Sequence, residues 1–131
     1  MFLGEHPTTL DDKRRLYLPK KIRDFLKNSE LVFSRGFESC IFVWLREDWE
    51  RANQKNLDNP ITDLGARNIR RYLFSGAEIL LADKLGRCLV PDHLTKYAHL
   101  KSEIVLIGAG DHFEIWDKEL WNQYFDILEA Q

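Results

Sequence analysis

Hydrophobic and polar residues follow two different periods along this chain, and the periods recur twice in the same order. Apolar residues at every second position predict strands, and apolar residues three or four apart predict helices. In the first half, this pattern predicts strands over 6–10 and 15–19, a strand pair turning at glycine over 30–44, and helices after Pro19 and from residue 46. In the second half, it predicts strands over 77–82 and 87–91, a strand pair over 103–116, and helices after Pro91 and from residue 117. One further helical pattern, over 63–74, follows a loop at 57–63.

The two halves also share residues at a constant spacing of 72 positions. The segment "DDKRRLYLP" begins at Asp11 and "DKLGRCLVP" begins at Asp83, and both contain Asp, three residues, Arg, three residues and Pro. Nine of the 59 residue pairs at this spacing are identical, against about three or four expected from average amino-acid usage. The identical pairs are Phe2 with Phe74, Gly4 with Gly76, Asp11 with Asp83, Arg15 with Arg87, Pro19 with Pro91, Gly36 with Gly108, Trp44 with Trp116, Glu47 with Glu119, and Trp49 with Trp121.

This duplication predicts two half-domains in one chain. A copy of about 55 residues buries too little surface to be stable alone, so we expect the copies to pack about a pseudo-two-fold axis and share one core. The predicted boundaries are residues 1–56 for the first repeat, 57–72 for a linker with the extra helix, and 73–131 for the second repeat.

Charge is distributed unevenly although the net charge is only −2. Residues 11–23 hold six basic and two acidic residues, a net +4, whereas residues 111–131 hold six acids and one lysine, a net −5. Such a dipolar chain can present one basic face to a polyanion. Two ordinary solvated surfaces explain the same distribution, so charge alone leaves both interpretations open.

Other features of the sequence predict no catalytic or membrane function. No apolar run approaches the roughly 18 residues of a membrane span, and the first residues lack the apolar core of a signal peptide. We therefore expect a soluble, cytoplasmic protein that is not an enzyme and binds no membrane or small-molecule substrate. The Gly-x-Gly in "IVLIGAGDHF" lacks the third glycine and the following helix of a dinucleotide site, so it predicts a hairpin turn.

The cysteines, histidines and tryptophans are expected to serve structure. Cys40 and Cys88 form no Cys-x-x-Cys pair and are expected to be buried free thiols. The four histidines lack metal-ligand spacing, so we expect no metal and no other cofactor. The four tryptophans are expected in the core or in contacts between protomers: Trp44, Trp49, Trp116 and Trp121.

The repeated Asp-x-x-x-Arg segment is the candidate functional motif. Alternation along the second strand of each copy places Arg15 opposite Leu16, and likewise Arg87 opposite Cys88, so both arginines are expected to point outward. Two outward arginines related by a pseudo-two-fold axis suit phosphates or guanine edges. A local Asp–Arg ion pair that stiffens the turn explains the motif equally well.

The segments "LDDKRRLYLP", "RRYLFSGA", "DKLGRCLVP" and "GDHFEIWDKELW" resemble the MraZ family of bacterial regulators over essentially the whole chain. The resemblance implies an α+β, mainly β fold of the AbrB-like group. In that fold, two tandem swapped-hairpin half-barrels form one pseudo-two-fold barrel with flanking helices. It also implies a ring homo-oligomer that binds short G-rich direct repeats in double-stranded DNA. Those repeats lie upstream of the division and cell-wall gene cluster, which the family regulates together with its own gene, and the family is nucleoid-associated.

The resemblance also assigns candidate DNA-binding residues. The motif positions and the basic residues between them are Asp11, Lys13, Arg14, Arg15, Asp83, Lys84 and Arg87. The family usually has glycine before the motif arginine, as at Gly86, whereas the first copy has Arg14. If that position is left-handed, a residue other than glycine costs roughly 1 kcal/mol, so the two loops are not assumed to be equivalent.

AbrB-like barrels also serve as antitoxins that bind a protein toxin through an extended tail. Both ends of this sequence fall within the two copies, and no long polar tail follows Gln131. The resemblance therefore favours a DNA-binding regulator, with an antitoxin or protein-interaction module as the alternative.

Overall fold

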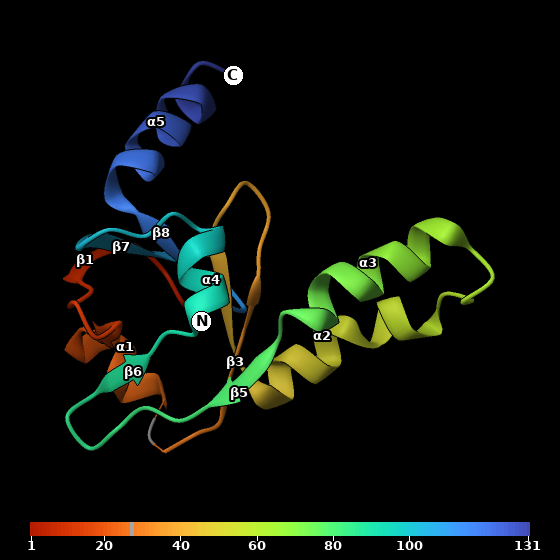
Figure 1. The fold of residues 1–131 in the computed structure, drawn as a ribbon, viewed down its shortest axis with the longest axis horizontal. Coiled ribbons are helices and arrows are strands. Elements are labelled where there is room, and N and C mark those ends of the chain that lie inside the picture. The colour runs from red at the N-terminus through yellow and green to blue at the C-terminus, as the bar shows by residue number, and fades with distance from the viewer. Residues whose placement is uncertain (27) are drawn as a thin grey trace.

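The computed structural model describes residues 1–26 and 28–131, which form eight strands and five helices (Figure 1). The strands are β1 (Glu5–Thr9), β2 (Arg15–Tyr17), β3 (Leu31–Arg35), β4 (Ile41–Leu45), β5 (Glu78–Leu80), β6 (Arg87–Leu89), β7 (Glu103–Gly108) and β8 (Phe113–Asp117). The helices are α1 (Lys20–Leu26), α2 (Arg46–Asp58), α3 (Leu64–Ser75), α4 (Asp92–Tyr97) and α5 (Lys118–Glu129). The predicted α+β class is confirmed, with eight strands against five helices in the part of the chain that the structure describes.

The order of elements repeats as the sequence predicted. Two strands, a short helix, two strands and a longer helix run from β1 to α2 and again from β5 to α5. The extra helix is α3. Asp63 precedes it as the N-cap, and the Asp63 side chain accepts a hydrogen bond from the main-chain N–H of Ala66. Helix α2 continues to Asp58, so the predicted loop at 57–63 is two residues shorter than expected.

The two copies exchange strands. All pairings are antiparallel, and the large sheet has the order β1-β7-β8-β4-β3-β5. Each copy therefore contributes its first strand to the other copy's hairpin, because β1 pairs with β7 and β5 pairs with β3. The middle pairing joins β4 to β8 about the pair Phe42 and Glu114, which are related by the spacing of 72. The sheet is open, with β1 and β5 at its edges, and β2 and β6 form a separate pair.

One strand pair departs from the spacing of 72. Leu31 of β3 pairs with Leu45. At the spacing of 72, the counterparts of these residues are Glu103 and Asp117. Asp117 pairs with Ile104 instead of Glu103. Strands β3 and β7 are therefore related by 73 positions, which requires one more residue before β7 and one fewer in the turn after it. The ungapped match of Gly36 with Gly108 is consequently not a structural equivalence.

The hydrophobic core is shared by both copies, because buried side chains from each belong to one cluster. Strand alternation buries Leu16 and Cys88 fully and leaves Tyr17 and Leu89 exposed at 39% and 55%. Cys40 is also buried, so the prediction of two buried free thiols is confirmed. Trp116 and Trp121 are 3% and 8% exposed, whereas Trp44 and Trp49 are only half-buried.

Helices α2 and α3 form an arm that extends away from the sheet (Figure 1). The arm has almost no core of its own: α3 buries no residue, and α2 buries only Asn53. Apolar side chains on and between these helices stay exposed, including Ile61 at 62% and Leu64 at 57%. No helix of the described residues is long and apolar enough to cross a membrane.

Candidate nucleic-acid interface

The first motif loop is closed by one carboxylate. Oδ1 of Asp11 accepts hydrogen bonds from the main-chain N–H groups of Lys13 and Arg15, both at 2.9 Å. Oδ2 accepts from Nε of Arg15 at 2.6 Å. The main chain closes the same loop, because Asp11 N donates to Arg15 O and Arg14 N donates to Asp11 O. Asp11 therefore shapes the turn and also orients the arginine that ends it.

The second motif loop has the same hydrogen bonds. Oδ1 of Asp83 accepts from the main-chain N–H groups of Leu85 and Arg87 at 2.9 Å, and Oδ2 accepts from Nε of Arg87 at 2.7 Å. Asp83 N donates to Arg87 O, and Gly86 N donates to Asp83 O. The sequence "DKLGR" at 83–87 thus forms the same loop as "DDKRR" at 11–15, although the residues between Asp and Arg differ.

The two loops interlock. Leu18 N donates to Gly86 O and Val90 N donates to Arg14 O, each at 2.9 Å, so each loop bonds to the residue just after the other copy's strand. Strands β2 and β6 pair about Leu16 and Cys88, which are related by the pseudo-two-fold axis. The repeated motif therefore forms one paired element at the axis rather than two separate turns.

The residue before each motif arginine has a left-handed backbone. The φ angle is 61° at Arg14 and 77° at Gly86. A Cβ at Gly86 would also lie 2.1 Å from Cδ of Arg23. The second loop therefore requires glycine for two reasons, whereas the first loop keeps the same hydrogen bonds and bears the cost of a left-handed arginine.

Replacing Arg14 by glycine is expected to stabilise the protein. The left-handed conformation costs a non-glycine residue about 1–2 kcal/mol, and added freedom of the unfolded chain offsets about 0.4–1 kcal/mol of that. We expect the free energy of unfolding to rise by about 0.5–1 kcal/mol, measured by urea denaturation at fixed protein concentration. Arg14→Ala is the control, because it removes the charge and keeps the strain. A fall in stability for Arg14→Gly would show that the arginine's contacts outweigh its strain.

Both motif arginines point outward, as the strand alternation predicted. The side chains of Arg15 and Arg87 are 36% and 24% exposed, while Leu16 and Cys88 beside them are buried. The ion pairs with Asp11 and Asp83 are also present, so the predicted local Asp–Arg ion pair is confirmed in both copies. Each ion pair engages Nε, whereas a bidentate contact to guanine can use the terminal nitrogens of the guanidinium.

The two carboxylates stay ionised at neutral pH. Hydrogen bonds from the main-chain and side-chain nitrogens of Arg15, together with the Lys13 N–H, lower the pKa of Asp11 despite opposing desolvation. The equivalent bonds from Arg87 and Leu85 lower the pKa of Asp83. A permanently charged acceptor holds each arginine in one orientation, which reduces the entropy lost when the arginine binds a ligand.

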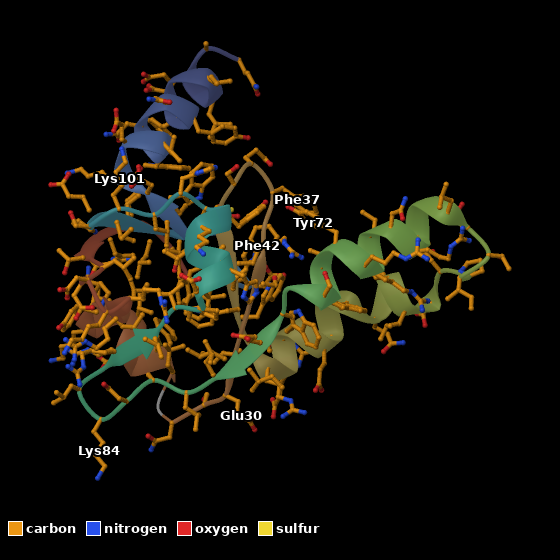
Figure 2. The ribbon with its side chains drawn as sticks, in the orientation of Figure 1. Glu30, Phe37, Phe42, Tyr72, Lys84 and Lys101 are labelled. Carbon is orange, nitrogen blue, oxygen red and sulfur yellow. The ribbon has the colours of Figure 1, made fainter. Side chains whose placement is uncertain are left out.

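The remaining predicted residues surround these loops. Lys13 and Lys84 are exposed at the loop tips, and Figure 2 shows Lys84 pointing away from the body of the protein, at the end opposite α5. Arg14 behaves differently, because its Nη1 lies 3.3 Å from Oδ1 of Asp92 at the start of α4. The extra charge of Arg14 is therefore partly neutralised within the chain.

Sequence reasoning missed two residues at this site. Tyr17 is paired with Arg87 across β2 and β6, and hydrogen bonding to Asp83 and Tyr17 raises the pKa of Arg87. Arg23 of α1 lies against Gly86 in the other copy's loop. The basic run over residues 11–23 contained a signal for Arg23, but the contact of Tyr17 depends on the pairing of β2 with β6.

The chemistry of this site is that of its arginines and lysines. Within residues 1–26 and 28–131, no group of three His, Cys, Asp or Glu residues is arranged to hold a metal ion. The arrangement offers two pre-oriented arginines and neighbouring lysines, which suit an anion.

Known proteins resemble this chain over nearly its whole length. A family model described as "MraZ protein, putative antitoxin-like" matches residues 1–72 and again residues 73–131. A relative from Heliobacterium modesticaldum is 41% identical over 124 residues, which cover 95% of this chain and 86% of the relative. Relatives from Tropheryma whipplei and Paenarthrobacter aurescens are 41% and 42% identical over 130 residues, covering 99% of this chain and 90% of each relative. All three are named "Transcriptional regulator MraZ". The chain therefore belongs to the MraZ family.

Proposed function

We propose that this protein is a sequence-specific DNA-binding transcriptional regulator that contacts double-stranded DNA through its two interlocked loops, 11–15 and 83–87. Its targets are short G-rich direct repeats upstream of the bacterial division and cell-wall gene cluster, which includes its own gene. It works by binding rather than catalysis, in the cytoplasm and on the nucleoid.

One observation carries this proposal: the paired loops present Arg15 and Arg87 on one element, each held by a carboxylate that leaves terminal nitrogens for other partners. Arginine bonds O6 and N7 of guanine together, which is the commonest specific contact to DNA. Lys13 and Lys84 at the loop tips suit phosphates, which position a protein without reading sequence. The printed names of the relatives support regulation of transcription.

A ring homo-oligomer explains how such a small contact becomes specific. One chain offers a single loop pair, so its affinity for one repeat is modest. Several loop pairs in one assembly engage several DNA repeats at once, and each further contact is then intramolecular. Avidity of this kind raises affinity by roughly 10²–10⁴ when the spacing permits simultaneous binding.

The test of the proposal is the salt dependence of binding to a promoter fragment that contains the repeats. Counterion release makes the logarithm of affinity fall linearly with the logarithm of salt concentration, by roughly 0.9 for each phosphate neutralised. Lys84→Ala is expected to make this slope shallower by about 0.9 for each copy that contacts DNA, measured by fluorescence anisotropy.

The matched control is Lys101→Ala, because Lys101 lies near the start of α5 (Figure 2) and its side chain is 74% exposed. We expect the control to keep the parent's slope. Equal slopes for the parent and Lys84→Ala, or equal affinity for promoter and scrambled DNA, would contradict the proposed interface.

A further inference from the structure

A second site lies outside the DNA-binding loops, in a hollow of about 270 Å³ between the β3–β4 turn and α5. Its volume is below the roughly 300–1,000 Å³ of pockets for drug-sized ligands, and it suits the head of one long side chain. Its lining includes five aromatic rings and two carboxylates, Glu38 and Glu114.

The rings of this aromatic–carboxylate pocket are suited to a cation. Trp116 stacks on Tyr124 with ring centroids 5.2 Å apart and planes at 23°, and Phe37 meets Phe42 edge-on at 5.7 Å. The negative faces of aromatic rings attract guanidinium and ammonium groups. The pocket therefore favours a basic side chain over a neutral apolar one.

The carboxylates add negative charge that the chain does not neutralise fully. Glu114 accepts from Nε1 of Trp116 at 2.9 Å and lies 3.3 Å from His112. Glu38 accepts from the hydroxyl of Tyr124 at 3.3 Å. Among the described residues, no lysine or arginine forms an ion pair with either glutamate. Burial, followed by the charge of Glu38, raises the pKa of Tyr124, which agrees with a negative environment.

The β3–β4 turn is held in a strained conformation that presents Glu38 to the pocket. Glu38 and Ser39 are consecutive left-handed residues, with φ of 60° and 65°. Sparsely populated backbone conformations of this kind cost about 1–3 kcal/mol each and concentrate at binding sites. Phe37, in the same turn, is 45% exposed although it is a large apolar side chain.

The α2–α3 arm has the complementary chemistry. Helix α3 contains three arginines and no acidic residue, whereas α5 contains three acids and one lysine. The carbonyls of Asn56, Leu57 and Asn59 hold Arg70 within the arm. Arg67 and Arg71 lie one helical turn apart on the face that also carries the exposed Leu64. Each uses only Nη1 within the arm, on the carbonyl of Ile61 and on Oδ1 of Asn68. An arm with so little core of its own gains stability when another surface covers this face.

We propose that the aromatic–carboxylate pocket receives an arginine from the α3 face of a second copy, formed by Leu64, Arg67 and Arg71. The inference rests on the ring proposed above and names its contact. The pocket and the α3 face are different surfaces of one chain, so the contact is head-to-tail, and a head-to-tail contact closes into a ring when the rotation permits. Exposed apolar residues of α5, including Phe125 at 38% and Ile127 at 57%, extend the contact beyond the pocket.

The experiment uses two variants of the full chain without DNA, measured by sedimentation velocity at the parent's assembly concentration and tenfold above it. Glu38→Arg blocks the pocket, and the double change Arg67→Ala with Arg71→Ala removes the basic face. We expect each variant alone to be monomeric with the parent's circular dichroism. When mixed in equal amounts, they should form a species of two chains and no larger, because only one intact pocket and one intact face remain.

Glu78→Arg and Arg51→Glu are the charge controls, because both residues are exposed and lie outside the pocket and the α3 face; both variants should assemble like the parent. Parent-like assembly of either test variant, or no association on mixing, overturns the proposed contact while leaving DNA binding intact. A monomeric parent would instead defeat the ring itself. Monomeric variants should still bind a single repeat through loops 11–15 and 83–87, which separates this contact from the DNA interface.

Discussion

Replacing Trp116 by alanine is expected to lower the free energy of unfolding by about 3–5 kcal/mol, the usual cost of truncating a buried tryptophan. Trp116 is 3% exposed and contacts the rings of Trp121 and Tyr124. Its Nε1 also donates to Glu114, so the truncation leaves that carboxylate without one donor. Chemical denaturation at fixed protein concentration measures the loss.

Trp44→Ala is the informative comparison, because Trp44 occupies the equivalent position in the first copy. Trp44 is only half-buried and stacks on His112 at 4.4 Å, so we expect a loss well below that of Trp116→Ala. Equal losses for the two variants would show that the exposed face of Trp44 is covered in the assembled protein. Parent-like stability of Trp116→Ala would contradict the packing described above.

Replacing Arg15 by alanine is expected to weaken binding to the promoter repeats by about 1–3 kcal/mol per guanine contact, the discrimination of one bidentate pair. Folding should change little, because the ion pair with Asp11 is partly exposed and such pairs contribute about 0–1 kcal/mol. We expect a larger effect for Arg15 than for Arg87, since Arg15 is more exposed and lies in the denser basic segment. Titrations of promoter and scrambled DNA at one salt concentration measure both variants.

Asp11→Ala separates the two roles of the motif. Asp11 accepts two main-chain hydrogen bonds in addition to the one from the side chain of Arg15. Its loss should therefore weaken DNA binding and destabilise the turn together. Arg15→Ala should affect binding alone. If Arg15→Ala binds the repeats as tightly as the parent, or fails only because assembly is lost, the arginine does not contact DNA directly.

The internal repeat made much of this architecture predictable from the sequence. Alternation around Leu16 and Cys88 identified both the buried faces and the outward direction of the motif arginines, because side chains on a strand alternate strictly. Proline and glycine marked the helix starts and turns, because their backbone restrictions are local. Aspartate and arginine four residues apart were enough to indicate a local ion pair, and the structure contains it in both copies.

Tertiary contacts decided the rest. The exchange of β1 and β5 between copies, the one-residue offset of β3 against β7, and the contact of Tyr17 with Arg87 all depend on which strands pair. Strand pairing joins residues far apart in the chain, so local periodicity does not determine it. The sequence by itself determined the repeated elements and the chemistry of the motif, because those follow from neighbouring residues. Only the folded chain brought the two loops into one element and placed Glu38 beside Tyr124, because both arrangements require the two copies to share a core.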